Sequence, residues 1–111
     1  MIDPERTIAA QATAAGQGAI AVIRMSGTRC TDVLGICTPV GFPARLRPRC
    51  ATLTHILEED GSPIDQVLVT HFPAPASYTG EDTVEISCHG GMLVTERLLK
   101  RLYQCGASPA E

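Results

Sequence analysis

The chain has few residues of several kinds, and each shortage excludes a class of protein. It contains no Trp and only 4% aromatic residues, which argues against a surface where nucleic-acid bases stack on rings. No run of about 18 apolar residues occurs, so the sequence predicts no membrane-spanning helix. The first six residues, MIDPER, are too charged for a signal peptide. We therefore expect a cytoplasmic protein.

Cysteine spacing and the lack of a phosphate-binding loop exclude two further kinds of site. The cysteines are odd in number, widely spread and without a Cys-x-x-Cys pair, so we predict free thiols and no metal site. They are Cys30, Cys37, Cys50, Cys88 and Cys105. No G-x-x-x-x-G-K-[ST] stretch occurs either, so the chain itself does not hydrolyse GTP or ATP by P-loop chemistry.

The net charge of the chain argues against strong binding of nucleic acid. Nine basic and twelve acidic residues leave a formal net charge of −3, so we expect no strong binding of nucleic acid through the overall field. A local basic patch is compatible with that balance. Arg45, Arg47 and Arg49 form a basic loop, which either touches RNA phosphates or is ordinary surface charge, and we favour the second interpretation.

The length of 111 residues and the apolar share of 44% suit one globular domain spanning 1–111. Alternating or β-branched stretches predict strands at 7–13, 19–25, 50–57, 64–72 and 83–89, and helical spacing predicts helices at 28–37 and 92–105. Glycine turns at 14–18 and at 58–61 suggest hairpins. The order β-β-α-β-β-β-α, with strands and helices not alternating regularly, predicts the α+β class.

The second helix has the clearest pattern. Val94, Leu98 and Leu102 form an apolar stripe at helical period, and Gly106 is placed to end the helix with a left-handed cap. The charged residues between them are expected to face water: Glu96, Arg97, Lys100 and Arg101. Because the chain ends shortly after this helix, we expect it to be one domain of a longer protein.

Two charged residues stand out inside apolar strands. Glu85 lies between Val84 and Ile86, and Arg24 lies within the stretch AIAVIRM. Glu85 either faces solvent or recognises a ligand, since a carboxylate matches an edge with two parallel N–H donors, as in pterins and guanines. Arg24 either reaches solvent at the strand end or serves a polar partner. The two side chains pairing with each other is a third alternative, which requires no ligand.

Two pairs of residues resemble catalytic groups and are discounted. Cys88 and His89 are neighbours on a strand, so their side chains point to opposite faces and do not meet. Glu81 and Asp82 diverge at the strand entry, so they do not form a working acid pair. We predict no catalytic residue in this chain.

The sequence resembles the N-terminal domain of the MnmE (TrmE) family of bacterial tRNA modification GTPases. The matching stretches are 7–10, 23–27, 64–67, 72–75, 77–82, 84–85 and 88–91, which together span nearly the whole chain. The strongest is the run from FPAP through SYTGED and VE to CHGG. Where the family often has Pro-Pro-Gly-Arg-Gly-Gly, this chain has AAGQGA at 14–19, and Arg29 and Cys30 replace the usual small residues.

The resemblance implies a fold and a ligand. In the family this domain binds tetrahydrofolate derivatives, as 5-formyl- or 5,10-methylene-tetrahydrofolate, and two such units form a homodimer similar to the folate-binding domain of glycine-cleavage aminomethyltransferases. By position, Arg24 and Glu85 match folate contacts. The alternatives are a dimerisation module without useful folate affinity and a fragment of such an aminomethyltransferase.

The resemblance also implies an activity for a longer parent protein. With the flavoprotein MnmG, the family modifies C5 of the wobble uridine of tRNA. A separate potassium-dependent G domain, which also uses magnesium, hydrolyses the GTP. The G domain and the helical domain of the family lie outside this chain, so we expect no enzymatic turnover from the chain alone.

Overall fold

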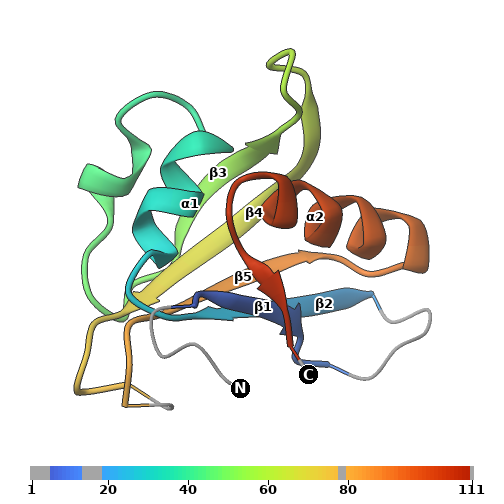
Figure 1. Cartoon of the computed structure of the whole chain (residues 1–111). Coiled ribbons are helices and arrows are strands. Elements are labelled where there is room, and N and C mark those ends of the chain that lie inside the picture. The colour runs from blue at the N-terminus through green and yellow to red at the C-terminus, as the bar shows by residue number, and fades with distance from the viewer. Residues whose placement is uncertain (1–5, 14–18, 78–79, 111) are drawn as a thin grey trace.

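Strands from both halves of the chain form one mixed sheet, and both α-helices lie on the same face of it (Figure 1). The computed structural model describes residues 6–13, 19–77 and 80–110. The elements are β1 (Ile8–Gln11), β2 (Ile20–Ser26), α1 (Cys30–Ile36), the 3₁₀ helix η1 (Phe42–Arg45), β3 (Thr52–Leu57), β4 (Pro63–Phe72), β5 (Thr83–His89), α2 (Met92–Gln104) and β6 (Ser108–Pro109). The predicted α+β class is confirmed.

The strand order is β3-β4-β5-β2-β1-β6. Every neighbouring pair is antiparallel except β1 and β6, which run parallel. The predicted hairpin of β3 and β4 is present, and Gly61 at its turn has φ 87°. β1 and β2 also pair antiparallel, while the turn predicted at 14–18 lies outside the described residues.

The sequence analysis missed two short elements. Four residues of the predicted loop, Phe42–Arg45, form a 3₁₀ helix whose Phe42 side chain is buried. Ser108–Pro109 forms the edge strand β6, and the Ser108 N–H donates to the Thr7 carbonyl at 2.8 Å. The chain therefore returns to the sheet after α2 and pairs with its own first strand. A two-residue strand carries no alternation from which it could have been predicted.

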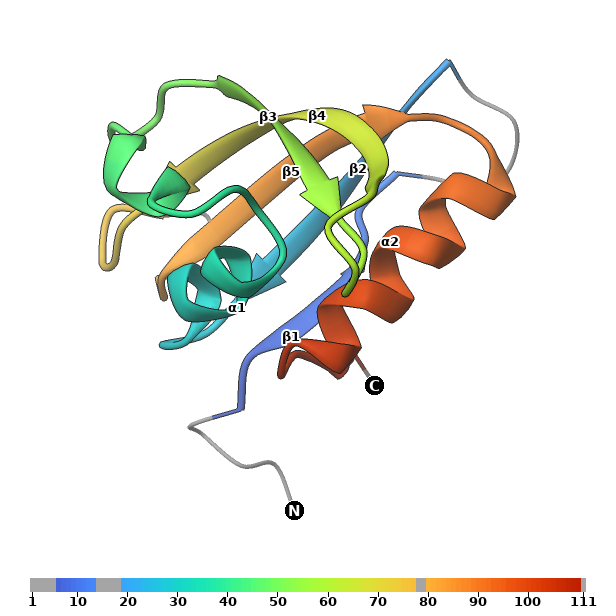
Figure 2. The ribbon, with the colours of Figure 1, turned by 90° about the horizontal axis from the view of Figure 1, so that it is seen from above.

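The core lies between the sheet and the two helices. Figure 2 shows the ribbon from the side on which these helices lie. Alternate residues of each strand point into the core, among them Ile23 and Met25 of β2 and Val84 and Ile86 of β5, all fully buried. Gly27 lies at the edge of this core with φ 139°. A Cβ there would come within 2.7 Å of the Thr7 backbone, so the close approach requires glycine.

Helix α2 confirms the predicted apolar stripe and its cap, with one correction. Leu98 and Leu102 are buried, and Gly106 follows the helix with φ 120°. Arg101 was expected to face water but is only 7% exposed. Its Nε donates to the Leu57 carbonyl at 2.7 Å, so the guanidinium joins the end of β3 to α2. The prediction failed because a hydrogen bond to a backbone carbonyl makes a buried arginine tolerable, and periodicity does not reveal such a partner.

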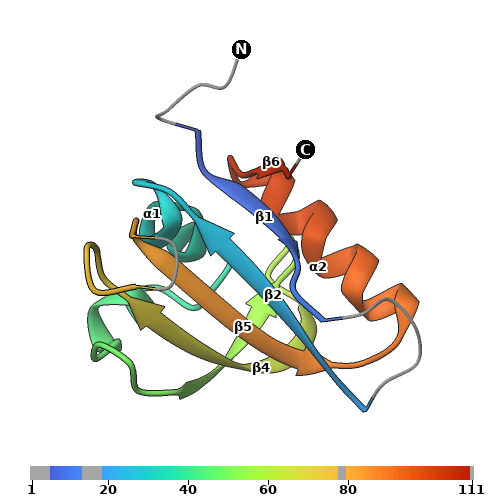
Figure 3. The same ribbon diagram turned by 90° about the horizontal axis from the view of Figure 1, so that it is seen from below.

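The opposite face of the sheet is not covered by a helix of the described chain (Figure 3). The strand residues that alternate with the core residues point to this side, which we call the open face. It carries the side chains of Arg24 and Glu85 together with three large apolar side chains. These are Ile20, Leu53 and Leu68, with exposed fractions of 66%, 54% and 44%.

Candidate functional site

The two charged residues singled out in the sequence form an ion pair at the centre of the open face. Arg24 of β2 and Glu85 of β5 are direct cross-strand partners in the register of the two strands. The Arg24 Nε and Nη2 groups donate to Glu85 Oε2 at 3.0 and 2.7 Å. Their side chains are 33% and 28% exposed, so water or a ligand reaches both. Of the sequence alternatives, the mutual pair is confirmed.

The geometry of the pair leaves Glu85 able to accept further hydrogen bonds. Both guanidinium contacts fall on Oε2, and among the described residues no donor contacts Oε1. A carboxylate has about four lone-pair positions on its two oxygens, so Oε1 and the second lone pair of Oε2 remain available to an incoming group. Arg24 therefore holds the Glu85 carboxylate in position, and the carboxylate can still accept further hydrogen bonds.

A cavity of about 350 Å³ lies beside Glu85. Phe72, Ala76, Ser77 and Thr83 complete its lining, so it is bounded by the ends of β4 and β5 and by the loop that joins them. Such a volume is at the lower end of the range for small-molecule sites, which combine apolar walls with a few polar groups. Glu85 is the only charged residue in this lining within the described part of the chain.

Hydrogen bonds fix the loop that closes this cavity. Asp82 Oδ1 accepts from the Ala74 N–H at 2.8 Å, and the Asp82 carbonyl accepts from the Gly27 N–H at 2.9 Å. The Ser77 hydroxyl donates to the Glu81 carbonyl. The Asp82 carboxylate thus supports the loop backbone. Tyr78 and Thr79 of the same loop lie outside the described residues.

Cys88 and His89 point to opposite sides of the sheet, as predicted. Cys88 is buried on the helix side, and burial raises the pKa of its thiol to about 11. The His89 ring is 69% exposed, and its Nδ1 lies 2.7 Å from Asp65 Oδ1. Asp65 also accepts the His89 backbone N–H at 2.9 Å. His89 therefore fastens the end of β5 to β4 and does not activate the thiol.

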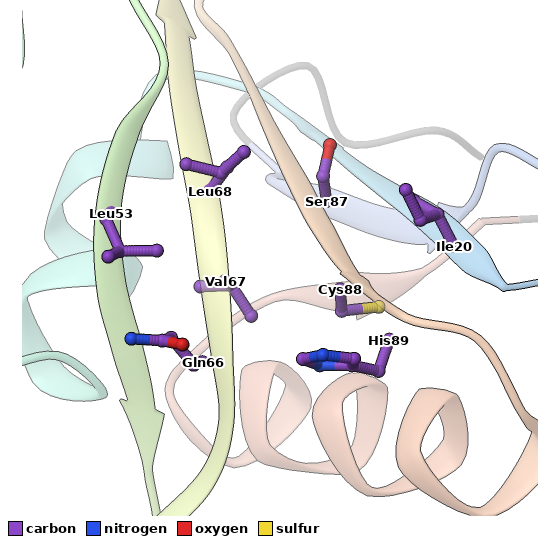
Figure 4. A pocket seen from close by; sticks show the side chains of 8 residues that line it. All are labelled: Ile20, Leu53, Gln66, Val67, Leu68, Ser87, Cys88 and His89. Carbon is purple, nitrogen blue, oxygen red and sulfur yellow. The ribbon is translucent and has the colours of Figure 1, made fainter.

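A second, smaller cavity of about 210 Å³ lies on the sheet near His89 (Figure 4). Its lining comes from four strands: Ile20 of β2, Leu53 of β3, Gln66, Val67 and Leu68 of β4, and Ser87, Cys88 and His89 of β5. The three exposed apolar side chains of the open face all belong to it. The hollow is thus an apolar depression in the uncovered sheet, separate from the cavity beside Glu85.

The other buried thiols are poor nucleophiles. Burial raises the pKa of Cys30 and of Cys37 to about 12 each, and it also raises the pKa of Cys105. Cys50 is exposed, and all five cysteines are free, as predicted. The part of the chain that the structure describes contains no cluster of His, Cys, Asp and Glu able to hold a metal ion. It also contains no helix long and apolar enough to cross a membrane.

Comparison with known proteins decides the family. The family model described as "GTP-binding protein TrmE N-terminus" matches residues 7–111. The chain belongs to this TrmE N-terminal family. The resemblance on which the sequence analysis relied is therefore confirmed, and the alternative of an aminomethyltransferase fragment is set aside.

Relatives of this TrmE N-terminal domain carry a common name. The tRNA modification GTPase MnmE of Akkermansia muciniphila is 78% identical over 111 residues, which are 100% of this chain and 25% of the relative. The MnmE of a Janthinobacterium species is 47% identical over 100 residues, covering 89% of this chain and 21% of the relative. That of Pseudothermotoga lettingae is 44% identical over 106 residues, covering 95% and 23%. The chain thus spans about a quarter of the length of these relatives.

The sequence analysis identified the charged pair but not the cavity. Phe72 and Ser77 were part of the matching stretches, and Thr83 was the first residue of a predicted strand, each without a role of its own. The strand register places Phe72 opposite Thr83 and Thr70 opposite Glu85. Alternation along β5 places Thr83 on the same face as Glu85. This was the sequence signal from which Thr83 could have been predicted as a neighbour of the site.

Proposed function

We propose that this domain binds a tetrahydrofolate derivative of the 5-formyl type in the cavity beside Glu85. In this proposal the Glu85 carboxylate accepts two N–H groups from the pterin edge, and Arg24 holds that carboxylate in place. Arg24 and Glu85 are thus the folate-binding residues. The observation that carries the proposal is the partly exposed Glu85, which lines a 350 Å³ cavity and has Oε1 without a donor among the described residues.

The residues of the cavity fit the chemistry of a pterin. The Phe72 side chain offers an apolar surface for a flat ring, and Ser77 and Thr83, whose hydroxyls donate to the Glu81 carbonyl, belong to the lining as well. A carboxylate facing two parallel N–H donors forms paired, charge-assisted hydrogen bonds, which are shorter and stronger than neutral ones. These features support a ligand that is planar, mostly apolar and has a two-donor edge.

We also propose that the domain forms a homodimer through its open face. Ile20, Leu53 and Leu68 are large apolar side chains that are 44% to 66% exposed and surround one depression. A contiguous apolar patch of this kind is favourable to cover, because each buried Å² of apolar surface contributes about 25 cal/mol. A second copy of the chain has the same patch, so a two-fold contact satisfies both at once.

For the parent protein we propose the activity that the relatives' name describes, tRNA modification coupled to GTP hydrolysis. The partners proposed with it are the flavoprotein MnmG and tRNA in the cytoplasm, with GTP, magnesium and potassium in a G domain outside this chain. This chain then supplies folate binding and dimerisation and has no turnover of its own. A dimerisation module without useful folate affinity is the competing function.

Calorimetric titration of the chain with 5-formyl-tetrahydrofolate separates the two functions. We expect saturable heat with one site per chain, and Glu85→Ala abolishing it. Glu96→Ala, which removes an exposed carboxylate from α2, is the matched control and should bind as the parent chain does. No heat at millimolar ligand would leave only the dimerisation function.

Light scattering measures the mass of the same samples. The parent chain and Glu85→Ala should both have the mass of a dimer, whereas Leu68→Glu on the open face should yield a monomer. Leu93→Glu changes an equally apolar, 77% exposed residue on α2 and should leave the dimer intact. A parent chain that is monomeric at high concentration contradicts the dimer.

A further inference from the structure

Three of the nine basic residues of this acidic chain lie close together in one exposed segment. Arg45, Arg47 and Arg49 are all exposed and lie within five residues. No Asp or Glu occurs in the sequence between Asp32 and Glu58, so the segment has no acidic neighbour along the chain. We call residues 45–49 the arginine segment.

The arginine segment also differs in its partners from four other arginines of the described chain. Arg24, Arg29 and Arg97 each lie within 4.0 Å of a carboxylate, and Arg101 donates to a backbone carbonyl. For the three arginines of the segment, the described residues provide no carboxylate at that distance. The guanidinium of Arg45 lies 6.0 Å from the centre of the Phe42 ring. Within the described chain, the three guanidinium groups therefore have no carboxylate as a partner.

The backbone of this segment is fixed at both ends. Phe42 is buried just before it, and Leu46 packs against the core. Pro48 forms a parallel bridge with His71 of β4, and the Arg49 N–H donates to the His71 carbonyl at 2.8 Å. Arg49 adopts φ 60°, a left-handed value that a non-glycine residue keeps only where its surroundings impose it. The guanidinium groups thus project from a backbone that is already ordered.

The anchor of the segment adjoins the cavity of the proposed function along the chain. His71 directly precedes Phe72 of the cavity wall. The Asp82 carboxylate, 3.8 Å from His71 Nε2, already accepts the Ala74 N–H.

We propose that the arginine segment is a contact surface for the phosphodiester backbone of RNA. Guanidinium groups bind phosphate oxygens through paired N–H donors, and an ordered backbone lowers the entropy lost on binding. The described surface beside the arginines has no group of exposed aromatic rings on which bases could stack. The contact should therefore depend on the charge and position of the phosphates and not on the base sequence. The choice of RNA over other polyanions rests on the proposed function, because a tRNA is the substrate named for the relatives.

The expected binding is weak and strongly dependent on salt. Three phosphate contacts predict a slope of log K against log salt concentration of about −2 to −3. Between 50 and 200 mM salt the affinity should therefore fall by about 15- to 65-fold. Such a contact agrees with the expectation that an acidic chain does not bind nucleic acid strongly.

Fluorescence anisotropy with a labelled, unmodified tRNA transcript tests this surface in the intact chain. The double variant Arg47→Gln, Arg49→Gln should reduce the salt slope by about 2. The control is Arg97→Gln, Lys100→Gln on α2, which changes the net charge equally and should keep the slope of the parent chain. Equal effects of the two double variants, or no tRNA binding at millimolar chain and 50 mM salt, would overturn the proposal.

Two further measurements distinguish RNA binding from the binding of any polyanion, and test tRNA binding separately from folate binding. Poly-L-glutamate at matched charge should compete at least tenfold more weakly than RNA, and equal competition would overturn the assignment to phosphodiesters. Titration of the arginine double variant with 5-formyl-tetrahydrofolate should match the parent chain. If the double variant loses tRNA binding but still binds folate, the result supports the arginine segment as the RNA contact. If the parent chain does not bind folate, the result contradicts the proposed function and leaves the arginine segment unaffected.

Discussion

Replacing the two members of the Arg24–Glu85 pair one at a time distinguishes a ligand-binding carboxylate from a purely structural ion pair. Because the two side chains are 33% and 28% exposed, the pair behaves largely as a surface interaction and contributes about 1 kcal/mol or less to folding. We therefore expect Glu85→Gln and Arg24→Gln each to lower the melting temperature by about 4 °C or less.

The effects of the two variants on folate binding should differ. Glu85→Gln keeps the shape of the side chain but replaces a charged acceptor by a neutral amide, which removes two charge-assisted hydrogen bonds to the pterin edge. That loss should raise the Kd by about 100-fold, which corresponds to about 3 kcal/mol. Arg24→Gln leaves the carboxylate in place but unanchored, and ordering one side chain costs about 1 kcal/mol, or about fivefold in Kd.

Calorimetric titration with 5-formyl-tetrahydrofolate, paired with thermal unfolding of each variant, measures both quantities. The reasoning is refuted if Glu85→Gln binds folate as tightly as the parent chain, since the pair would then serve only the sheet. It is also refuted if the two variants lose affinity equally, because Arg24 would then not be acting through Glu85. A melting temperature lowered by more than about 15 °C would show that the pair is essential to folding.

Three other measurements test the fold. Arg101→Met should destabilise the chain by about 1–3 kcal/mol in urea unfolding, since the buried carbonyl of Leu57 loses its donor, while Lys100→Met at the exposed neighbour should stay within about 0.5 kcal/mol. In the folded chain only Cys50 should react with iodoacetamide at pH 7.5, as measured by mass spectrometry. Modification of a second thiol before the chain unfolds would contradict the burial of the other four cysteines. Because burial raises the pKa of Cys30 from 9.0 to about 12, the unfolded chain releases this proton first as the pH rises. Between pH 9 and pH 12 this one thiol should therefore lower stability by about 1.4 kcal/mol per pH unit, on top of the similar contributions of the other buried thiols, and Cys30→Ala should reduce the slope by that amount.

The strands were predictable because their residues alternate, and the site was predictable only in part. Alternation along β5 placed Val84 and Ile86 inside and Glu85 outside, and the structure agrees. The same pattern correctly separated Cys88 from His89. It could not show which strand lies next to β5, and that choice decides whether Arg24 and Glu85 meet. Pairing between distant strands depends on the whole core and not on local spacing.

Two of the failures of prediction have the same physical origin. Arg101 lies on the inner face of α2 because its guanidinium reaches a carbonyl of β3, and β6 forms because an open edge of β1 is available to pair. In both cases the partner is a backbone group from a remote part of the chain. Sequence patterns describe side chains, so they do not reveal hydrogen bonds that a fold offers to its own backbone.

The central place of β2 beside β5 has a consequence for how the molecule acquires its site. Arg24 and Glu85 are 61 positions apart, so they meet only after the chain has closed a long loop. Contacts of such sequence separation form late and slow the search for the native state. A ligand that binds through this pair therefore binds only to chains in which β2 and β5 are already paired. Such a ligand should slow unfolding but should not accelerate the early steps of folding.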